Sequence, residues 1–414
     1  MFGAIRFCFR REYRSLMVIA VLLVVSSVVA FGTGFWLLFR LSYILIFGVA
    51  AALFIAWANL RALSVDVERR TDRAQVGQHA LEVIEVRNRS LFPRFWLEAE
   101  DPSEMPGHHS GLVILLPPRG SRNWMVDTEL RRRGVFKWGP ARIASTDPFG
   151  IFRITREIGT SQEILVYPQV VELPHFEVPP ANLPGEGRFR RRTHQVTPNA
   201  NGVREYAPGD SFNRIHWKSS ARMGHIMVKT FELDPASDIW VVLDLEARVQ
   251  SGSGDESTEE YGVRVAASVS RHYLIASRSV GLISFGEDLR VIDAERGPQQ
   301  LTRILESLAT ARAVGDVSLG SILLEEQRRF GRHTTVILVT SSTDDTWFTQ
   351  LLSLTQRGVR VAVILLDQST LGGTESPLLL FGELAASDVM TYVVQGGDDL
   401  SVALGPSPGT RVTA

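Results

Sequence analysis

The sequence contains very little cysteine and lysine. Cys8 is the only cysteine, which excludes an intramolecular disulfide and a cysteine-rich zinc site. Arginine supplies almost all of the positive charge, since Lys137, Lys218 and Lys229 are the only lysines. The formal net charge of −1 argues against a nucleic-acid-binding protein, whose binding domain is usually strongly basic. At roughly 100–200 residues per domain, a chain of 414 residues is expected to form two or three ordered domains.

The usual signatures of hydrolases and nucleotide-binding enzymes are also missing. The sequence has no Gly-x-Ser-x-Gly elbow, no Walker-type Gly-Lys-Ser/Thr and no His-Glu-x-x-His. His216 has Ser219 and Ser220 close by, but nothing specifies the third group that would orient a catalytic base. His108-His109 lies among glycine, proline and serine, which predicts a surface loop. We predict that the protein is not an enzyme and has no catalytic residues.

Two long uncharged segments lie near the N-terminus. Residues 15–39 and 41–60 contain no charged side chain and are separated by Arg40. About 20 apolar residues span a bilayer core, whereas the apolar region of a signal peptide has about 7–15. The pattern predicts a transmembrane helical hairpin over residues 15–60, preceded by a basic arm at residues 1–14. Its turn lies either at Gly32-Thr-Gly34 or around Arg40 and Ser42.

Arginines flank the predicted hairpin on both sides. Four lie within residues 1–14, and Arg61, Arg69 and Arg70 follow the second segment. Cytoplasmic flanks of membrane helices carry an excess of arginine and lysine. We therefore expect a multi-pass protein of the inner (cytoplasmic) membrane, with both termini and the soluble domains in the cytoplasm. Arg40 is expected near the far interface. An adhesion module outside the cell is an alternative that the flanking arginines oppose.

Short alternating segments separated by turn residues fill residues 61–173. The expected strands are Leu63–Val67, Leu81–Val83 with Val86, Gly111–Leu116, Val135–Trp138 and Ile164–Tyr167. Breakers lie between them, among them Asp147-Pro-Phe-Gly150, which is typical of a β-turn because proline fixes φ and glycine accepts a positive φ. This spacing predicts an all-β, sandwich-like domain over residues 61–173.

The pattern changes after a connector at residues 174–237 that is rich in proline, glycine and arginine. From residue 238 to residue 400, apolar runs alternate with segments of helical periodicity, beginning with Ile239–Leu245. Continuous apolar runs are typical of strands covered on both faces, and strand–helix alternation favours a doubly wound, mainly parallel sheet. We predict an α/β domain over residues 238–400 and a frayed tail at 401–414.

The connector contains a segment whose residues suggest a capped helix. Pro208-Gly209 predicts a turn, Asp210 is a good N-cap for a helix that begins at Ser211, and Gly224 is a plausible end. Such a helix would place Arg214, Lys218 and Arg222 on one face. Because three stacked cations repel one another, they need anionic partners within the protein or on another molecule. Glu205 and Asp210 are the nearest internal candidates. Trp217 would more often pack in a core than form a binding surface.

These residues resemble the signature of the bacterial family called domain of unknown function fifty-eight. The matching elements are Arg204-Glu-Tyr206, Pro208-Gly-Asp210, Arg214-Ile-His-Trp217, Ala221-Arg222 and, in the β-rich region, Arg133-Gly134 and Asp147-Pro-Phe-Gly150. The resemblance covers most of the chain. It implies a two-helix hairpin, a β-rich middle and a C-terminal von Willebrand factor A-like domain. It also implies association with MoxR-type AAA+ ATPases and an adaptor role in assembly or envelope processes.

The resemblance leads us to expect a protein-binding surface in the signature segment. Its candidate residues are Arg204, Tyr206, Asp210, Arg214, Trp217, Lys218 and Arg222. The expected function is that of a membrane-anchored, non-enzymatic adaptor, with an AAA+ ATPase as the expected class of partner.

A von Willebrand factor A domain often binds Mg²⁺ through an Asp-x-Ser-x-Ser loop with a further Thr and Asp, which supply the oxygen ligands that the ion prefers. Here the loop reads Asp244-Leu-Glu246-Ala-Arg248, so that the aspartate matches and both serines are missing. Arg248 places positive charge where a cation would bind. We predict a degenerate site, with Asp244 at most as a ligand and no cofactor, in which an Asp244–Arg248 salt bridge replaces the ion.

Other strand ends are expected to contribute to the same crevice, because ligands gather at the carboxyl ends of strands in open α/β sheets. The crevice residues are Asp244, Glu246, Arg248, Asp316, Ser318 and Ser341. The strand that ends at Thr340-Ser341-Ser342 lacks the expected aspartate unless Asp344 or Asp345 bends back. A metal-dependent enzyme or a Mg²⁺-gated receptor that uses this crevice is the alternative function, and retained metal affinity would favour it.

Overall fold

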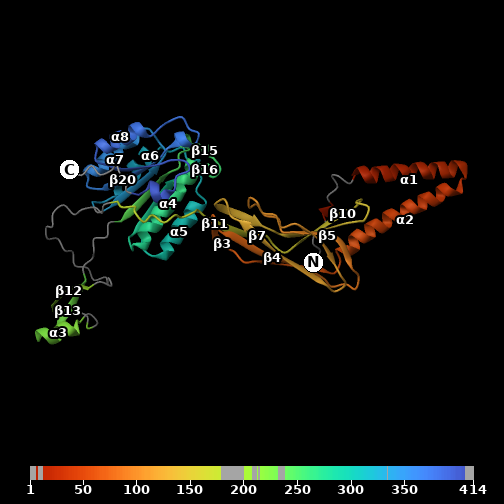
Figure 1. Ribbon diagram of the computed structural model, residues 1–414, viewed down its shortest axis with the longest axis horizontal. Helices are drawn as coiled ribbons and strands as arrows, with labels where there is room; N and C mark the ends of the chain where they lie inside the picture. The colour runs from red at the N-terminus through yellow and green to blue at the C-terminus, as the bar shows by residue number, and fades with distance from the viewer. Residues whose placement is uncertain are drawn as a thin grey trace. The chain divides into compact units, whose positions relative to one another are not determined.

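The computed structural model describes residues 6–7, 13–178, 200–207, 212, 215–231, 238–332 and 334–405 (Figure 1). The chain divides into two compact units, Met1–Gln169 and Val170–Ala414. Most of the predicted basic arm, about half of the predicted connector and most of the predicted tail lie outside the described residues. Each unit is described by itself below.

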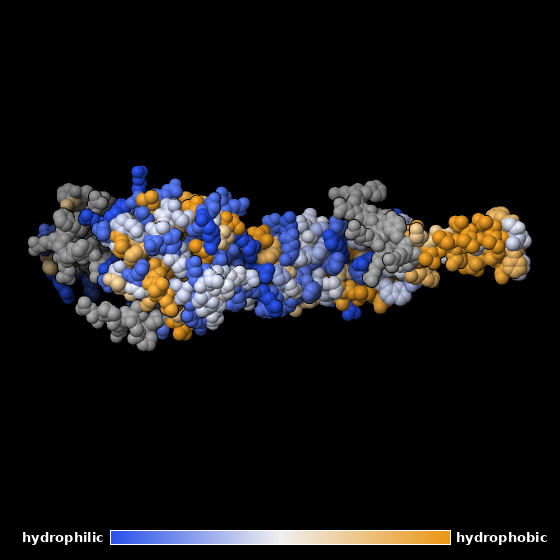
Figure 2. Space-filling model, turned by 90° about the horizontal axis from the view of Figure 1, so that it is seen from above, coloured by the Kyte–Doolittle hydropathy of each residue, from blue (hydrophilic) through white to orange (hydrophobic). Residues whose placement is uncertain are grey.

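Two apolar helices begin the first unit, α1 (Tyr13–Thr33) and α2 (Trp36–Asn59). Both are long and apolar enough to cross a membrane, and Figure 2 shows them as an almost continuous hydrophobic surface. The turn between them is at Gly34, whose φ of +68° favours glycine. The structure therefore selects the first of the two expected turn positions. Arg40 lies within α2, with its guanidinium 4.0 Å from the ring centre of Trp36.

Hydroxyl groups join the two helices. The Oγ atoms of Ser26 and Ser42 are 2.9 Å apart, and both side chains are buried. Ser42 also donates to the carbonyl of Leu38 in its own helix at 3.0 Å. Hydrogen bonds of this kind contribute to helix association in an apolar environment, where a lone hydroxyl has no water to bond.

The β-strands of the first unit follow α2 directly. They are β2 (Leu63–Arg69), β3 (Arg73–Gln75), β4 (His79–Asn88), β5 (Arg94–Glu100), β6 (Leu112–Leu116), β7 (Ser121–Glu129), β8 (Gly134–Trp138), β9 (Ala141–Thr146), β10 (Arg153–Ile158) and β11 (Gln162–Tyr167), with β1 (Arg6–Phe7) at an edge. They form sheets ordered β1-β10-β9-β5-β6, β2-β4-β7 and β3-β11-β8. All pairs are antiparallel except β3–β11. The five strands expected from the sequence are confirmed.

One hydrophobic core joins this β-domain (residues 63–167) to helix α2. Ile84 of β4 faces Leu97 of β5 and Ile143 of β9, and all three side chains are almost completely buried. Ala56 and Leu60, at the end of α2, belong to the same cluster. Alternation of buried and exposed residues along β4 places its apolar face in this core, as the period of two predicts.

A cluster of buried polar groups lies at the end of the β-domain that is farther from α2. Arg69 donates to both carboxylate oxygens of Asp101, at 2.9 and 2.8 Å. The Trp138 indole donates to Glu82 at 2.8 Å, and the His108 ring lies 3.6 Å from the other oxygen of Glu82. The His108 side chain is 2% exposed, so the prediction of a surface loop at His108-His109 is wrong for its first residue. Loss of water around Glu82 raises its pKa to about 8, and nearby Asp101 acts in the same direction.

The raised pKa of Glu82 makes the stability of the β-domain depend on pH. The folded state holds this proton more tightly than the unfolded chain, whose glutamate has a pKa of 4.5. The stabilisation is therefore fully present below about pH 4.5 and is lost as the pH rises through 8. We expect Glu82→Gln to reduce the fall in melting temperature of the detergent-solubilised chain between pH 5.5 and 8.5. Glu163→Gln, at an exposed position of β11, is the control; equal pH dependence in all three proteins would contradict the prediction.

The second unit is built on one six-stranded sheet. Its order is β18-β17-β14-β19-β20-β21, parallel throughout except that β18 is antiparallel to β17. The strands are β14 (Ile239–Asp244), β17 (Val280–Phe285), β18 (Leu289–Glu295), β19 (Thr335–Thr340), β20 (Arg360–Leu366) and β21 (Met390–Val394), with a small hairpin of β15 (Gly252–Ser253) and β16 (Glu256–Ser257). The mixed sheet agrees with the expected α/β architecture. The sequence did not predict β18 and β21.

Helices cover both faces of this sheet (Figure 1). They are α4 (Thr258–Ile275), α5 (Pro298–Ala309), α6 (Leu319–Glu326), α7 (Thr346–Gln356), α8 (Leu378–Ala386) and α9 (Leu400–Ala403). Val241 and Leu243 of β14 lie in one core with α4 and α5, and Trp240 and Val242 lie in the other with α6 and α7. Every residue of β14 is buried, which is why its sequence is a continuous apolar run.

Candidate functional site

The signature segment folds as a small separate element. Strands β12 (Ala200–Glu205) and β13 (Met227–Phe231) pair antiparallel, and helix α3 (Trp217–Met223) lies between them in the chain. We call residues 200–207, 212 and 215–231 the signature module. Ile215, Met227 and Val228 are its buried apolar residues. The bridge between Ile215 and Val228 holds the chain extended just before α3.

Helix α3 begins six residues later than expected. Its N-cap is His216, whose Nδ1 accepts a hydrogen bond from the Ser219 amide at 3.2 Å. The prediction of a helix from Ser211 is therefore wrong, because Ile215 is in a β-bridge. Lys218 and Arg222 lie in α3, whereas Arg214 is outside the described residues. The predicted helix end at Gly224 is confirmed by its left-handed φ of +74°.

The structure places the seven predicted binding residues unevenly. Trp217, Lys218 and Arg222 lie on α3, and Tyr206 follows β12 with its amide bonded to the Ile226 carbonyl at 2.9 Å. Arg204 belongs to β12, but its side chain is outside the described part. Asp210 and Arg214 lie outside the described residues altogether.

Among the described residues of the module, more of the large apolar side chains are exposed than buried. Trp217 is 69% exposed and Phe212 is 72% exposed, although tryptophan in this position was expected to pack inside. Met223 and Ile226 are exposed as well. The Tyr206 ring lies 6.3 Å from that of Phe212. Exposed apolar side chains gathered in so small an element are typical of an interaction surface.

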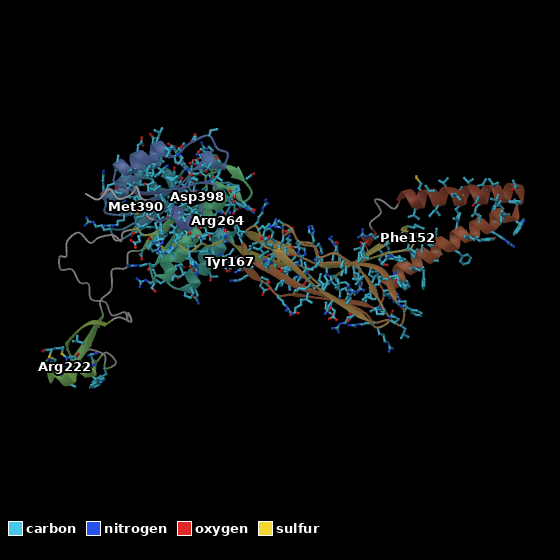
Figure 3. All side chains as sticks on the ribbon, viewed as in Figure 1. Phe152, Tyr167, Arg222, Arg264, Met390 and Asp398 are labelled. Carbon is cyan, nitrogen blue, oxygen red and sulfur yellow. The ribbon has the colours of Figure 1, made fainter. Side chains whose placement is uncertain are left out.

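Two cations border these apolar side chains. Lys218 and Arg222 are exposed on α3, where Figure 3 labels Arg222. Within the described ranges neither forms an ion pair. Of the two expected internal partners, Glu205 lies 3.1 Å from the His225 ring and Asp210 is outside the described residues, so the internal salt-bridge cluster stays a prediction. The arrangement can offer positive charge and an aromatic surface to a partner.

The second candidate site lies at the carboxyl end of β14. Asp244 is 3% exposed, and Thr340, at the end of the neighbouring β19, donates to its Oδ2 at 2.6 Å. The Glu246 amide donates to Oδ1 at 3.0 Å. Burial raises the pKa of Asp244 to about 6, although both hydrogen bonds favour the carboxylate. The sequence predicted Thr340 as the end of a strand but did not predict that it is the hydrogen-bond partner of Asp244.

Arg248 does not replace a metal ion in the predicted way. Its Nε lies 3.4 Å from a carboxylate oxygen of Glu246, and its side chain is 79% exposed. Asp244 instead takes its hydrogen bonds from Thr340 and from the backbone. The predicted Asp244–Arg248 salt bridge is therefore wrong, because Arg248 points to water while Asp244 is enclosed.

The other predicted crevice residues have structural contacts. The Ser341 hydroxyl donates to the Val249 carbonyl at 2.6 Å, which ties β19 to the loop after β14. Ser318 is the N-cap of α6. Asp316 is exposed, although its neighbour Gly315 forms a bridge with Glu246. Asp344 does not bend back; its carboxylate accepts from the Thr346 amide at 3.0 Å, at the start of α7. The backbones of these loops therefore lie close together, but their carboxylates do not gather around a common point.

This donor set does not fit Mg²⁺. Both oxygens of Asp244 accept hydrogen bonds, and the Thr340 hydroxyl donates to Asp244 while accepting from the Ser342 amide at 2.9 Å. Glu246 is paired with Arg248. Among the residues that the structure describes, no group of three or more His, Cys, Asp and Glu side chains could hold a metal ion. An octahedral site needs several oxygen ligands that converge on one point, and the described side chains here do not form such a group.

A family model described as "Protein of unknown function DUF58" matches residues 202–373. The matched region begins in the signature module and extends beyond β20, so it contains both candidate sites. Over residues 202–373 the chain is therefore similar to the DUF58 family. The resemblance seen in the sequence is thereby confirmed.

Curated DUF58-like relatives carry no assigned function. The uncharacterized protein YeaD of Bacillus subtilis is 25% identical over 367 residues, which cover 83% of this chain and 87% of YeaD. The uncharacterized protein Rv1480 of Mycobacterium tuberculosis is 26% identical over 171 residues, or 40% of this chain and 53% of Rv1480. The likeness to YeaD thus includes much more than the region that the DUF58 model matches.

Solved structures resemble parts of this chain only distantly. A CARDB domain from Pyrococcus furiosus is 12% identical, with a TM-score of 0.20, over 25% of this chain and 94% of that domain. Proximal thread matrix protein 1 from the mussel byssus is 15% identical, with a TM-score of 0.29, over 41% of this chain and 46% of its own. No functional argument rests on either likeness.

The hydrogen bond from Thr340 to Asp244 leads to a stability prediction. Thr340→Val keeps the shape of the side chain but removes the donor, so the buried carboxylate of Asp244 loses one partner. We expect a loss of about 1–3 kcal/mol in the free energy of unfolding, the usual cost of an unsatisfied buried polar group. Chemical unfolding of the detergent-solubilised chain at pH 7.5 measures it. Thr335→Val, at the other end of β19, is the matched control; equal losses in both variants would contradict the role given to Thr340.

The engaged oxygens of Asp244 also lead to a prediction about magnesium. Calorimetric titration of the solubilised protein with MgCl₂ should give no binding heat in the micromolar range, and Asp244→Asn should behave in the same way. Micromolar binding that disappears in Asp244→Asn would show that the crevice is a metal site after all.

Proposed function

We propose that the protein is a membrane-anchored, non-enzymatic adaptor whose signature module binds a protein partner. The observation that carries the proposal is the exposure of Trp217 and Phe212 beside the cations Lys218 and Arg222. Aromatic and arginine side chains are the residues that most often dominate protein–protein interfaces. A partner that fits would present an apolar groove bordered by acidic residues.

The anchor in this proposal is the α1–α2 hairpin, inserted with both ends in the cytoplasm of a bacterial cell. Its support is the apolar length of both helices and the arginines that flank them. In this orientation α2 delivers the β-domain and the rest of the chain to the cytoplasmic face. Arg40, near the start of α2, then reaches the far interface with Trp36, where such residues are commonly found.

We further propose that the second unit is a von Willebrand factor A-like domain with a degenerate metal site. The mixed sheet with helices on both faces is compatible with this fold. The enclosed Asp244 and the paired Glu246 favour a domain that binds without a metal ion and catalyses nothing. A MoxR-type AAA+ ATPase is the partner class that the family resemblance implies, in an assembly or envelope process.

A pull-down from native membranes tests the adaptor function. Wild-type protein in mild detergent should retain an AAA+ ATPase, with an amount that differs between samples with and without ATP. Arg222→Glu and Trp217→Ala should lose it, because they reverse a charge and remove the central aromatic side chain. Arg328→Glu, an equal charge reversal at an exposed position of the α/β domain, is the control and should retain it.

Two results would contradict this proposal. One is retention of the same partners by wild type, Arg222→Glu and Trp217→Ala. The other is the absence of any ATPase from the wild-type sample. Circular dichroism of each variant, which should match wild type, separates a lost contact from a lost fold.

A further inference from the structure

Three turns gather at the end of the β-domain where helix α2 enters it. They are residues 88–93, 117–120 and 147–152. The Arg89 amide donates to the Ala62 carbonyl, just after α2, at 2.8 Å, and the Arg119 amide donates to the Ser90 carbonyl at 3.0 Å. The third turn connects β9 to β10, and β9 pairs with β5 such that Ser145 lies opposite Leu97. All three turns therefore surround the last residues of α2.

Helix packing sets the depth of these turns relative to a bilayer. Helix α2 has 24 residues and is about 36 Å long at 1.5 Å per residue, whereas the hydrocarbon core is about 30 Å thick. Its final turns are not free: Ala52 and Ala56 are completely buried, and the Asn59 side chain donates to the Phe95 carbonyl at 3.3 Å. If α2 spans the core, the β-domain turns that contact its end lie at the membrane interface.

The side chains that these turns present outward are large and apolar. Phe149 is 70% exposed, Phe92 is 72% exposed and Leu91 is exposed as well, and so is Trp96 in β5, directly after the first turn. Trp96 has a φ of +49°, an unusual conformation for tryptophan, in the bulged part of β5. Aromatic side chains at the ends of membrane helices are characteristic of proteins that contact the interfacial region of the bilayer.

An apolar cavity of about 630 Å³ lies beside the third turn. It is lined by Val18 and Ile19 of α1, by Ile44 and Val49 of α2, and by Phe149. The neighbouring Phe152 is labelled in Figure 3, near the point where the two helices approach the β-domain. The cavity therefore opens between the helices at a depth where lipid acyl chains lie, and its lining matches their chemistry.

Exposed charge in and beside the three turns is mainly positive, and the acidic residues next to the turns, Glu85 and Glu98, are paired with Arg87 and Arg153. Arg61, Arg89, Arg119 and Arg122 are exposed around the turns. Asp147 is the one acidic residue in the three turns, and it is buried, with its carboxylate accepting from the Phe149 amide at 2.8 Å. Exposed arginines beside inserted apolar groups match a surface of anionic phospholipids.

We propose that these turns form a lipid-binding collar, in which Phe149, Phe92, Leu91 and Trp96 insert among interfacial lipids and the exposed arginines contact headgroup phosphates. An acyl chain occupies the cavity between Phe149 and the two helices. The inference rests on the proposed membrane anchor, but it adds that the β-domain itself touches the bilayer. The partner is the anionic bilayer, and no protein is needed to cover these side chains.

Fluorescent labels at single cysteines test the collar in the full chain. In a Cys8→Ser background, Phe149→Cys and Leu91→Cys are labelled with an environment-sensitive fluorophore and reconstituted into phosphatidylcholine–phosphatidylglycerol vesicles. Both labels should be quenched by nitroxide-bearing acyl chains and should resist aqueous iodide. The control is Arg131→Cys, just beyond the far end of β7, about 30 Å away at 3.3 Å per strand residue, where iodide should quench and lipid nitroxides should not.

A label at Phe47→Cys, on the exposed surface of α2, reports on the anchor independently. If Phe47 is quenched by lipid while Phe149 and Leu91 are quenched by iodide, the collar is wrong and the anchor stands. If all three labels avoid lipid quenching, the anchor and the collar both fail. A Phe149 label that is shielded from both quenchers would show that protein covers the turn, which also overturns the lipid assignment.

Discussion

The contact of Ala56 and Leu60 with the core of the β-domain is the constraint on which the arrangement of the first unit depends. These residues end helix α2 and share a hydrophobic cluster with Ile84, Leu97 and Ile143. Because β2 begins at Leu63, only a few residues separate the helix from the sheet. The hairpin and the β-domain therefore behave as one packed body, and any membrane position of α2 fixes that of the turns around it.

A different principle governs the second unit, where the hydrogen bonds of a buried carboxylate are supplied by the protein itself. Thr340 and the Glu246 amide satisfy Asp244, and Ser341 ties the same strand to the loop that follows β14. Such a network stabilises the carboxyl edge of the sheet. An exposed aromatic side chain and an exposed cation occur together on the signature module, at Trp217 and Arg222. We therefore place recognition on the module and structural integrity at the strand ends.

Periodicity predicted five strands of the β-domain, four strands of the sheet in the second unit and the two apolar helices, because burial of whole faces leaves a regular pattern. It did not predict β3, β5, β7, β9 and β10. It was insufficient for β18, whose residues are half-exposed at an edge, and for β21. Helix α3 was misplaced since Asp210 looked like an N-cap, whereas the pairing of Ile215 with Val228 delays the helix until His216. Tertiary contacts also explain the buried His108 and the Thr340–Asp244 bond, because Thr128 and Asp244 lie far from their partners in the sequence.

The central claim is that the face of α3 that carries Trp217 touches another protein. Replacing Trp217 with the photoreactive benzoylphenylalanine in living cells, followed by irradiation and mass spectrometry, measures that contact directly. We predict a crosslink between this position and a second protein, an AAA+ ATPase, and none from the same amino acid at exposed Arg328. Crosslinks from position 217 that lead only to this chain, or to nothing, would contradict the claim.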